Sequence, residues 1–316
     1  MNLEVVIRDS VEAVVEGPDP TVLRLGLLLP LSGPLGLIGP SALDAARLAC
    51  SEINTAGGVM GRPIELVVSD VGGSPAEAAP FRQLAPALDW LTRHRRLGRW
   101  ALVGSDYIWT WSVHRVAAPL VRSIGGQVVL ERLVPFGLDP GRGSEELIDA
   151  LVEARVDAVL LSLIGRDLVM FNRAFSRANL GSRIVRISGS LEENGLLAAG
   201  GDDSGELYAS MRSFAGQQEA RRIALAENHR KLFGEHAPVL DAYSEGCYDG
   251  VHLAAALASA DGLNAAQAQR LSGHLLSPGD SGLSRKAWSA APLGPPRNGT
   301  YIARADGLDL SVIATL

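Results

Sequence analysis

The sequence predicts an α/β protein of two lobes, in which short parallel strands are flanked by helices. Short apolar runs alternate with helix-like segments along most of the chain, and this alternation is typical of βαβ units. Residues 23–68 already form one such unit, with an apolar run, a Gly/Pro turn, a helical segment, a double-glycine turn and a second apolar run. The length of 316 residues exceeds one ordinary core and suits two domains of about 150 residues each.

Turn residues and apolar spacing give the individual elements. Residues 3–15 are expected to form a hairpin that turns at residues 8–10, and residues 17–20 a linker. A strand at residues 23–29 precedes a helix that starts at the capping box of Ser41 and ends at the double glycine. The remaining expected elements are a strand at 63–68; a helix at 81–95; strands at 100–103, 127–130, 158–161, 183–187 and 207–211; helices starting near 109, 144, 167 and 191; helices at 219–233, 241–260 and 265–276; and a closing hairpin of 301–303 and 308–313 that turns at 305–307.

Composition excludes several classes of function. The net charge of −6 provides no basic footprint for nucleic acid. No run of about 18 apolar residues could span a membrane. Residues 1–20 lack the apolar core and small-residue cleavage site of a secretory signal. We therefore expect a cytoplasmic protein, or a periplasmic or other extracytoplasmic one if a signal has been trimmed.

Polar, glycine-containing residues follow three of the expected strands. They are GSDY at 104–107, SLIG at 162–165 and SGSLE at 188–192. Open α/β sheets bind ligands at the carboxyl ends of their strands, and helix N-termini there suit a carboxylate or an amide oxygen. Tyr107 would add a flat apolar wall with one polar end. The structural alternative is that each loop only caps its helix and shapes a turn.

Three motifs carry a family resemblance: PLSGPLG at 30–36, SEINTAGGVMGR at 51–62 and GSDYI at 104–108. The chain resembles the type I periplasmic-binding-protein family, in its branched-chain amino acid and amide branch. The GSDY segment looks like that of the amide-sensing regulators of bacterial amidase operons, and urea and short-amide transport receptors share it. The resemblance implies two lobes that close around a ligand, with no catalysis, cofactor or metal.

The same resemblance implies site residues and lobe boundaries. Tyr107 lines the ligand pocket in the family, and an acid near Glu192 faces the ligand ammonium in amino-acid receptors. Ile38 stands where relatives often carry an aromatic residue. The expected ligand-binding residues are Ile38, Ser105, Asp106, Tyr107, Ser162, Gly165 and Glu192. The expected division is residues 1–21 as an N-terminal extension, 22–97 with 240–290 as lobe I, and 98–239 with 291–316 as lobe II.

The first lobe departs from the family pattern. Between residues 73–75 and 81–83 the family carries roughly two further β/α units, each of which needs a dozen or more residues. Here only residues 76–80 connect the two points. The sequence therefore predicts a shortened first lobe, which arises either from a true deletion or from an omitted segment.

Competing classes fit less well. Gly33, Gly36 and Gly39 follow a strand but lack the G-x-G-x-x-G spacing of dinucleotide-binding folds. No G-x-S-x-G elbow is present, and the six histidines lack the spacing of a zinc site. A sugar-type repressor would need a basic helix-turn-helix in front of residue 20. Enzyme activity and DNA binding are not expected.

Two functions remain. The sequence favours an intracellular sensor of amides or nitriles that regulates an operon through a regulator protein. The alternative is the substrate-binding receptor of an ABC importer for branched-chain amino acids, urea or amides, with a permease as partner. The ligand is a small polar molecule in both cases, and a homodimer is left open.

Overall fold

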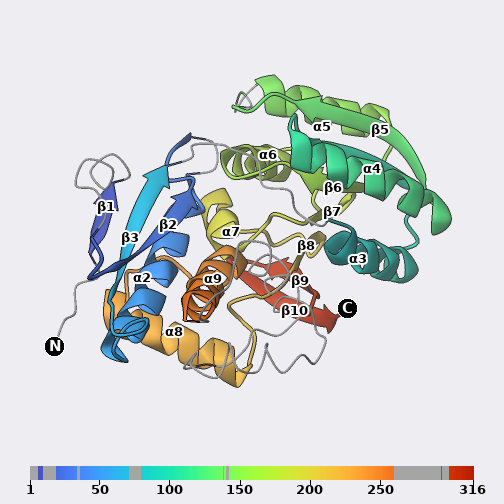
Figure 1. Ribbon diagram of the computed structural model, residues 1–316. Helices are drawn as coiled ribbons and strands as arrows, with labels where there is room; N and C mark the ends of the chain where they lie inside the picture. Colours follow the sequence, from blue (N-terminus) through green and yellow to red (C-terminus); the bar gives the residue numbers. More distant parts are fainter. Residues whose placement is uncertain are drawn as a thin grey trace. The chain divides into compact units, whose positions relative to one another are not determined.

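A computed structural model of the chain describes residues 6–9, 19–33, 36–70, 80–137, 139, 142–259, 293 and 299–316. The chain divides into two compact units, whose elements are labelled in Figure 1. Unit 1 comprises Met1–Leu31, Ile38–Val71 and Gln218–Asn298, and unit 2 comprises Ser32–Leu37, Gly72–Gln217 and Gly299–Leu316. Each unit combines a largely parallel sheet with helices, so the predicted α/β class is confirmed.

Unit 1 has a parallel sheet of three described strands, in the order β1-β3-β2. The strands are β1 (Ile7–Asp9), β2 (Leu23–Leu29) and β3 (Ile64–Asp70), and the helices are α2 (Gly39–Thr55), α8 (Ala220–Phe233) and α9 (Ala242–Ala258). One apolar core joins the sheet to all three helices, with Leu66, Leu225 and Tyr248 almost completely buried. Ala45 and Ala49 of α2 are also fully buried, and their small side chains let helices approach closely.

The expected N-terminal hairpin is wrong at its turn. Residues 7–9 are extended and pair in parallel with β3, where Ile7 lies opposite Leu66. The short apolar run of this segment, VVI at residues 5–7, is consistent with a strand but does not specify its partner, and the outer edge of β3 supplies one. Residues 10–15 of the expected hairpin lie outside the described residues.

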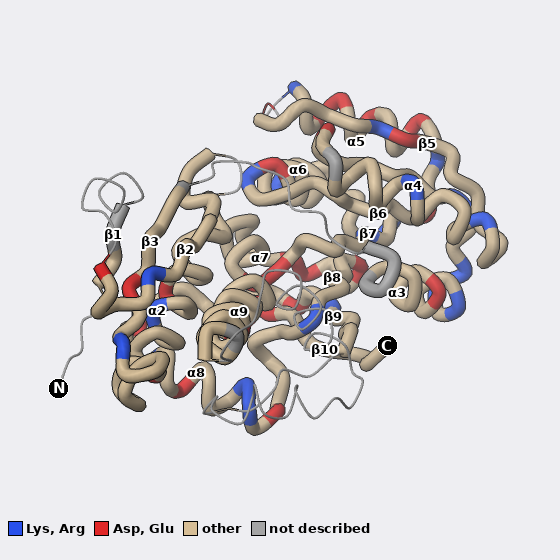
Figure 2. Tube along the Cα trace, viewed as in Figure 1, with Lys and Arg blue, Asp and Glu red and all other residues tan. Residues whose placement is uncertain are grey.

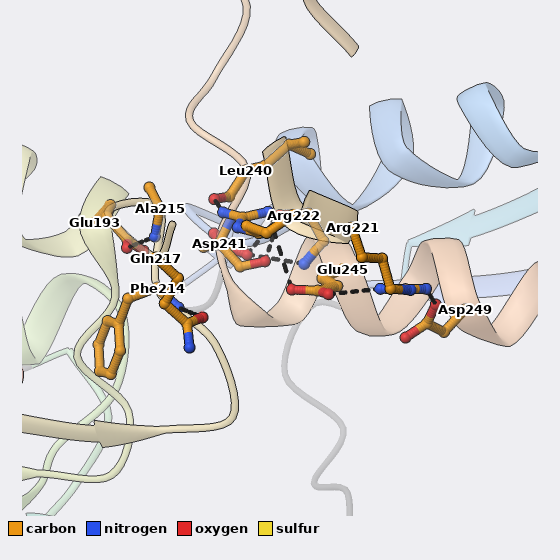
Figure 3. A network of polar contacts seen from close by, with 11 residues as sticks. Glu193, Phe214, Ala215, Gln217, Arg221, Arg222, Leu240, Asp241, Glu245 and Asp249 are labelled. Carbon is orange, nitrogen blue, oxygen red and sulfur yellow. Dashed lines mark hydrogen bonds and ion pairs between the residues drawn. The ribbon is translucent and has the colours of Figure 1, made fainter. Parts of the chain in front are cut away.

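Arg221 at the start of α8 clamps that helix to α9 (Figure 3). Its guanidinium lies 2.7 Å from a carboxylate oxygen of Glu245 and also pairs with Asp249. The neighbouring Arg222 donates to the backbone carbonyl of Leu240. These side chains are largely buried, so the ion pairs are well shielded from water.

Unit 2 has a sheet of seven strands in the order β10-β9-β8-β7-β6-β4-β5. The strands are β4 (Arg99–Ser105), β5 (Gln127–Val134), β6 (Ala158–Ser162), β7 (Val185–Ser188), β8 (Leu207–Met211), β9 (Tyr301–Asp306) and β10 (Asp309–Thr315); the helices are α3 (Pro80–Arg95), α4 (Ile108–Ser123), α5 (Arg142–Glu153), α6 (Arg166–Arg177) and α7 (Glu193–Ala199). The first five strands are parallel, whereas β9 and β10 form an antiparallel hairpin. Its turn falls at Gly307, whose φ is +62°, close to the predicted position.

The helices of unit 2 fall into two groups. The chain passes from β4 through α4 to β5 in one direction along the sheet, and from β6 through α6 to β7 in the other. Because parallel crossovers are right-handed, α4 covers one face, and α6 and α7 cover the opposite face. The packing of α3 on α4, and of α6 on both α5 and α7, agrees with this arrangement.

The unit boundaries differ from the expected lobe boundaries at α3 and α8. Helix α3 belongs to unit 2, because Arg95 reaches the hydroxyl of Tyr208 on β8 at 2.7 Å. Helix α8 belongs to unit 1, because Asn228 donates to Glu52 of α2 at 3.1 Å. The helix expected at 265–276 and the shortened junction at 71–79 lie outside the described residues.

A fully buried arginine ties a strand, a helix and a loop of unit 2 together. Arg186 of β7 donates to Asp202 at 2.8 Å and to Asn172 of α6 at 3.0 Å. Its guanidinium also lies 4.4 Å from the ring centroid of Phe175. A buried charge without its counter-ion costs several kcal/mol, so Asp202 is the partner that makes this arginine tolerable.

We predict that Asp202→Ala lowers the free energy of unfolding by about 3–5 kcal/mol, because it leaves the Arg186 guanidinium buried and unpaired. Urea denaturation measures the change. The matched control is Asp203→Ala at the neighbouring exposed position, with an expected effect below about 0.5 kcal/mol. Similar stabilities for the two variants would contradict the prediction.

Candidate functional site

The candidate site lies where the strand order of unit 2 reverses. Strands β4 and β6 are parallel neighbours, with Gly104 opposite Ser162, yet the chain leaves them toward opposite ends of the sheet. In open α/β sheets, ligands bind outside the carboxyl ends of the strands at such a switch point. Residues 105–107 and 163–165 follow these two strand ends. The topology therefore brings together two of the three polar loops selected from the sequence.

Ser105 ends β4 with a fully buried side chain. Its hydroxyl has no hydrogen-bond partner among the described residues. Buried polar atoms are almost always satisfied, so an exception calls for an explanation such as a ligand or an ordered water. Asp106 is exposed, and its carboxylate accepts a hydrogen bond from the indole of Trp111 at 2.8 Å.

Helix α4 begins directly after this turn without a side-chain cap. Its N-cap residue, Tyr107, is extended, with φ −160° and ψ 172°. The first N–H groups of a helix have no intrahelical partner, and they carry the positive end of the helix dipole. This end of α4 is therefore suited to a carboxylate or another anionic oxygen.

The ring of Tyr107 forms an aromatic cluster beside that helix end. Its centroid lies 5.1 Å from that of Phe136 and 6.2 Å from that of Trp109. The side chain is half-buried, and burial raises the pKa of the phenol far above its ordinary value. The hydroxyl therefore stays protonated, and Tyr107 offers a hydrogen-bond donor at the end of an apolar ring.

Gly165 begins α6 in a conformation that suits only glycine. Its φ is +53° and its ψ is −124°, and no side chain caps this helix either. A Cβ atom is strongly disfavoured in this region of φ/ψ space. The glycine predicted for the site is thus required by the sharp turn from β6 into α6.

We predict that Gly165→Ala destabilises the protein by about 1–3 kcal/mol, because alanine must adopt a strained backbone. Thermal unfolding measures the loss. Gly246→Ala is the control: Gly246 lies inside α9 with open space around it, and alanine there is expected to stabilise by about 0.5–1 kcal/mol. If Gly165→Ala is as stable as the native protein, the turn can adopt another backbone conformation, and the prediction is wrong.

Glu192 follows β7, the next strand along the sheet, and caps α7. Its two carboxylate oxygens accept the backbone N–H groups of Asn194 at 2.7 Å and of Gly195 at 2.8 Å. The N-terminus of α7 is thus already occupied by a carboxylate, whereas the first turn of α4 holds no acidic residue. The family resemblance places Glu192 near the ligand; the structure gives it a capping role at the same edge of the sheet.

Ile38 belongs to unit 1, apart from the other six predicted residues. It is half-buried and is the N-cap residue of α2, and its carbonyl accepts the hydroxyl of Ser41 at 3.2 Å. The Ser41 hydroxyl also lies 3.2 Å from a carboxylate oxygen of Asp241, which precedes α9. Ile38 therefore stands at the end of the loop after β2.

Ser162 directs its hydroxyl into the interior. The oxygen lies 3.0 Å from Nε2 of His114 and 3.3 Å from the carbonyl of Val103. On the other side of the ring, Nδ1 of His114 lies 2.9 Å from a carboxylate oxygen of Glu131. The structure thus adds His114 to the surroundings of the site; it is not among the residues that the sequence pattern indicates.

The buried stripe of α4 could have revealed His114. The helix buries Thr110, Val113, His114, Ala117 and Val121, which follow the spacing of one helix face. A histidine on such a stripe needs polar partners, because burying an unpaired polar group is costly. The sequence does not identify those partners, since they come from β5 and β6.

We predict that stability falls as the pH drops below about 6.5, the ordinary pKa of histidine. Burial lowers the pKa of His114, and the nearby Glu131 carboxylate offsets part of this decrease. Burial and the positive charge of Arg222 lower the pKa of His229. As the pH falls, the unfolded chain therefore binds protons before the folded chain does. The free energy of unfolding is fully retained above about pH 6.5 and decreases as the pH falls toward the folded-state pKa. Each histidine contributes a slope of up to about 1.4 kcal/mol per pH unit. Urea denaturation between pH 7.5 and 5 measures it; a slope in His114→Gln equal to that of the native protein would exclude a contribution from His114.

The described residues give no sign of a metal centre or a membrane span. No group of three or more His, Cys, Asp or Glu side chains among them could hold a metal ion. In the part of the chain that the structure describes, no helix is both long and apolar enough to cross a membrane. Figure 2 shows acidic and basic residues interspersed along both units.

Comparison with known proteins gives one family and several relatives. The sequence model of the family described as periplasmic binding protein matches residues 22–81 and 78–273. Leu/Ile/Val-binding protein homolog 7 of Brucella suis is 41% identical over 63 residues, which are 19% of this chain and 16% of that relative. Leu/Ile/Val-binding protein BraC3 of Rhizobium johnstonii is 34% identical over 55 residues, which are 17% of this chain and 15% of that relative. The chain thus matches only a small part of the length of these curated relatives.

Solved structures match over nearly the whole chain. A solute-binding protein of an R. palustris ABC transporter in complex with benzoate has a TM-score of 0.72 and 16% identity, covering 93% of this chain and 96% of that chain. A branched-chain amino acid transporter substrate-binding protein of Streptococcus pneumoniae in complex with isoleucine has a TM-score of 0.68 and 14% identity, covering 92% of this chain and 99% of that chain. At these identities the likeness shows a shared fold.

Proposed function

Because the chain belongs to the periplasmic-binding-protein family, whose members bind substrates and are not enzymes, we propose that it is the substrate-binding receptor of an ABC importer. The proposed ligand is a small carboxylate with an apolar side, foremost a branched-chain amino acid. The chain has the two-domain α/β fold of this family. The named relatives that match it in sequence are Leu/Ile/Val-binding proteins.

The observation that carries the proposal is the switch point between β4 and β6. There the uncapped start of α4 and the unsatisfied hydroxyl of Ser105 follow the same strand end. Backbone N–H groups would receive the ligand carboxylate, and Ser105 would supply one further hydrogen bond. Nothing else in the described part of unit 2 uses these groups.

The remaining predicted residues take separate roles in this proposal. The ring of Tyr107 would contact the apolar side chain of the ligand, and its protonated hydroxyl would donate. Glu192 is a proposed neighbour of the ligand ammonium group, beside the backbone N–H groups that it caps. We propose a supporting role for Ser162 and Gly165. The hydroxyl of Ser162 points into the interior, toward His114, and Gly165 shapes the turn into α6. Ile38 remains a proposed apolar contact from unit 1.

The amide sensor, which the sequence ranked first, has less support. Its basis in the binding region is the GSDY motif at residues 104–107. The relatives described above are named as Leu/Ile/Val-binding proteins, and the solved structures as binding proteins of transporters. The proposed partner is accordingly an ABC permease; the comparisons do not support a regulator protein or a homodimer. We propose an extracytoplasmic location, as the family name implies, instead of the cytoplasmic one that the sequence favoured.

We predict that isoleucine, leucine or valine binds with measurable heat in titration calorimetry, and that Tyr107→Ala weakens this binding at least about tenfold through loss of aromatic contact area. Benzoate, acetamide and urea are titrated in parallel to separate ligand classes. The control is Leu308→Ala, which changes an exposed residue in the β9–β10 turn and should leave affinity unchanged. If only acetamide binds, the amide-sensor function is favoured over the importer receptor. If none of the compounds produces heat, the result contradicts both functions.

A further inference from the structure

His114 connects the proposed ligand-binding turn to two strands. It lies in the second turn of α4, and its ring bridges Glu131 of β5, at 2.9 Å, and Ser162 at the end of β6, at 3.0 Å. Thr110, one helical turn earlier, donates its hydroxyl to the backbone carbonyl of Ser162 at 3.1 Å. Two side chains of α4 thus converge on the same residue of β6.

The chemistry of the three groups fixes the direction of these hydrogen bonds. A carboxylate can only accept, so Nδ1 of His114 carries a hydrogen and donates to Glu131. The neutral ring then accepts the Ser162 hydroxyl at Nε2. In the protonated ring, Nε2 would donate to Ser162, whose hydroxyl would turn to the carbonyl of Val103, 3.3 Å away.

This Glu-His-Ser connectivity is that of a hydrolase triad, but its surroundings exclude acyl transfer. Ser162 is fully buried and His114 is 4% exposed. A Cβ atom on Gly104 would lie 2.2 Å from the Ser162 hydroxyl oxygen and 2.4 Å from a methyl carbon of Thr110. A substrate carbonyl would need that space. The group is therefore built to hold protein elements together.

We propose that His114 is a positioning residue for the ligand-binding turn 105–107, acting through its hydrogen bond to Ser162. The turn is fixed at one end by β4 and at the other by α4, and the bond to Ser162 holds the start of α4 against β6. The expected effect of His114 on ligand affinity rests on the proposed function. The expected effect on the start of α4, which the bond to Ser162 holds in place, does not depend on any ligand.

The charged neighbours do not supply another explanation. Elements packed against α4 carry Glu131 and Arg132 on β5, Arg99 on β4, and Asp89, Arg93, His94 and Arg95 on α3. Of these, only Glu131 makes a hydrogen bond or ion pair with His114 among the described contacts. His114 thus has one charged partner, Glu131, and one neutral partner, Ser162. Suitable substitutions can remove either hydrogen bond and keep the other.

Two near-isosteric variants separate the partners. In His114→Gln the amide occupies the place of Nε2, so the bond to Ser162 is kept and that to Glu131 is lost. In His114→Asn the amide occupies the place of Nδ1, so the bond to Glu131 is kept and that to Ser162 is lost. We expect His114→Asn to bind isoleucine about tenfold more weakly than the native protein, the worth of one buried hydrogen bond, and His114→Gln to bind within about twofold.

A stability control and a ligand-free readout complete the experiment. Val121→Ala removes a fully buried side chain near the other end of α4 and should lower stability without changing affinity. Amide hydrogen exchange of residues 105–111 without ligand should accelerate about tenfold in His114→Asn and stay native-like in His114→Gln. If isoleucine and the other compounds fail to bind, the proposed function fails, while exchange still tests the positioning. Equal exchange in both variants, or weaker binding in Val121→Ala that matches its loss of stability, would overturn the inference.

Discussion

The pairing of β4 with β6 is the constraint on which the rest of unit 2 depends. These strands run parallel, and the chain leaves them in opposite directions, so right-handed crossovers place their helices on opposite faces. No loop then crosses the carboxyl ends between them. The close approach of Gly104 to Ser162 requires a residue without a side chain, and it leaves room for the hydroxyl that meets His114.

Several polar groups of unit 2 are paired inside it. Arg186 pairs with Asp202 and His114 with Glu131, and hydrogen-bond networks of this kind make a structure rigid. The Nε of Arg186 and the indole N–H of Trp100 have no partner among the described residues. At the end of β4, α4 lacks a side-chain cap, and the Ser105 hydroxyl also lacks a partner in this part of the chain. A rigid sheet that presents unsatisfied donors and acceptors along one edge is suited to binding without large rearrangement.

Local patterns predicted the elements well, but not their partners. The positions of β2, β8 and α8 follow from apolar runs and turn residues, and so does the loop at 104–107. The parallel pairing of β1 was missed, because a short apolar run does not specify which strand it pairs with or in which direction. The role of His114 was missed for a related reason, because its partners lie on other strands. The capping of α7 by Glu192 adds a local role, and its place beside the ligand stays a prediction.

The capping role of Glu192 bears on which ligands the proposed site can accept. A buried carboxylate without partners would demand an ammonium group, but Glu192 already accepts two backbone N–H groups. The amine of an amino acid would therefore add to binding without being essential. The start of α4 favours a full negative charge over a neutral amide oxygen by about 1 kcal/mol, the usual scale of a helix dipole. Charge at the carboxylate end, more than the amine, should thus decide selectivity, and this ordering separates a carboxylate receptor from an amide sensor on physical grounds.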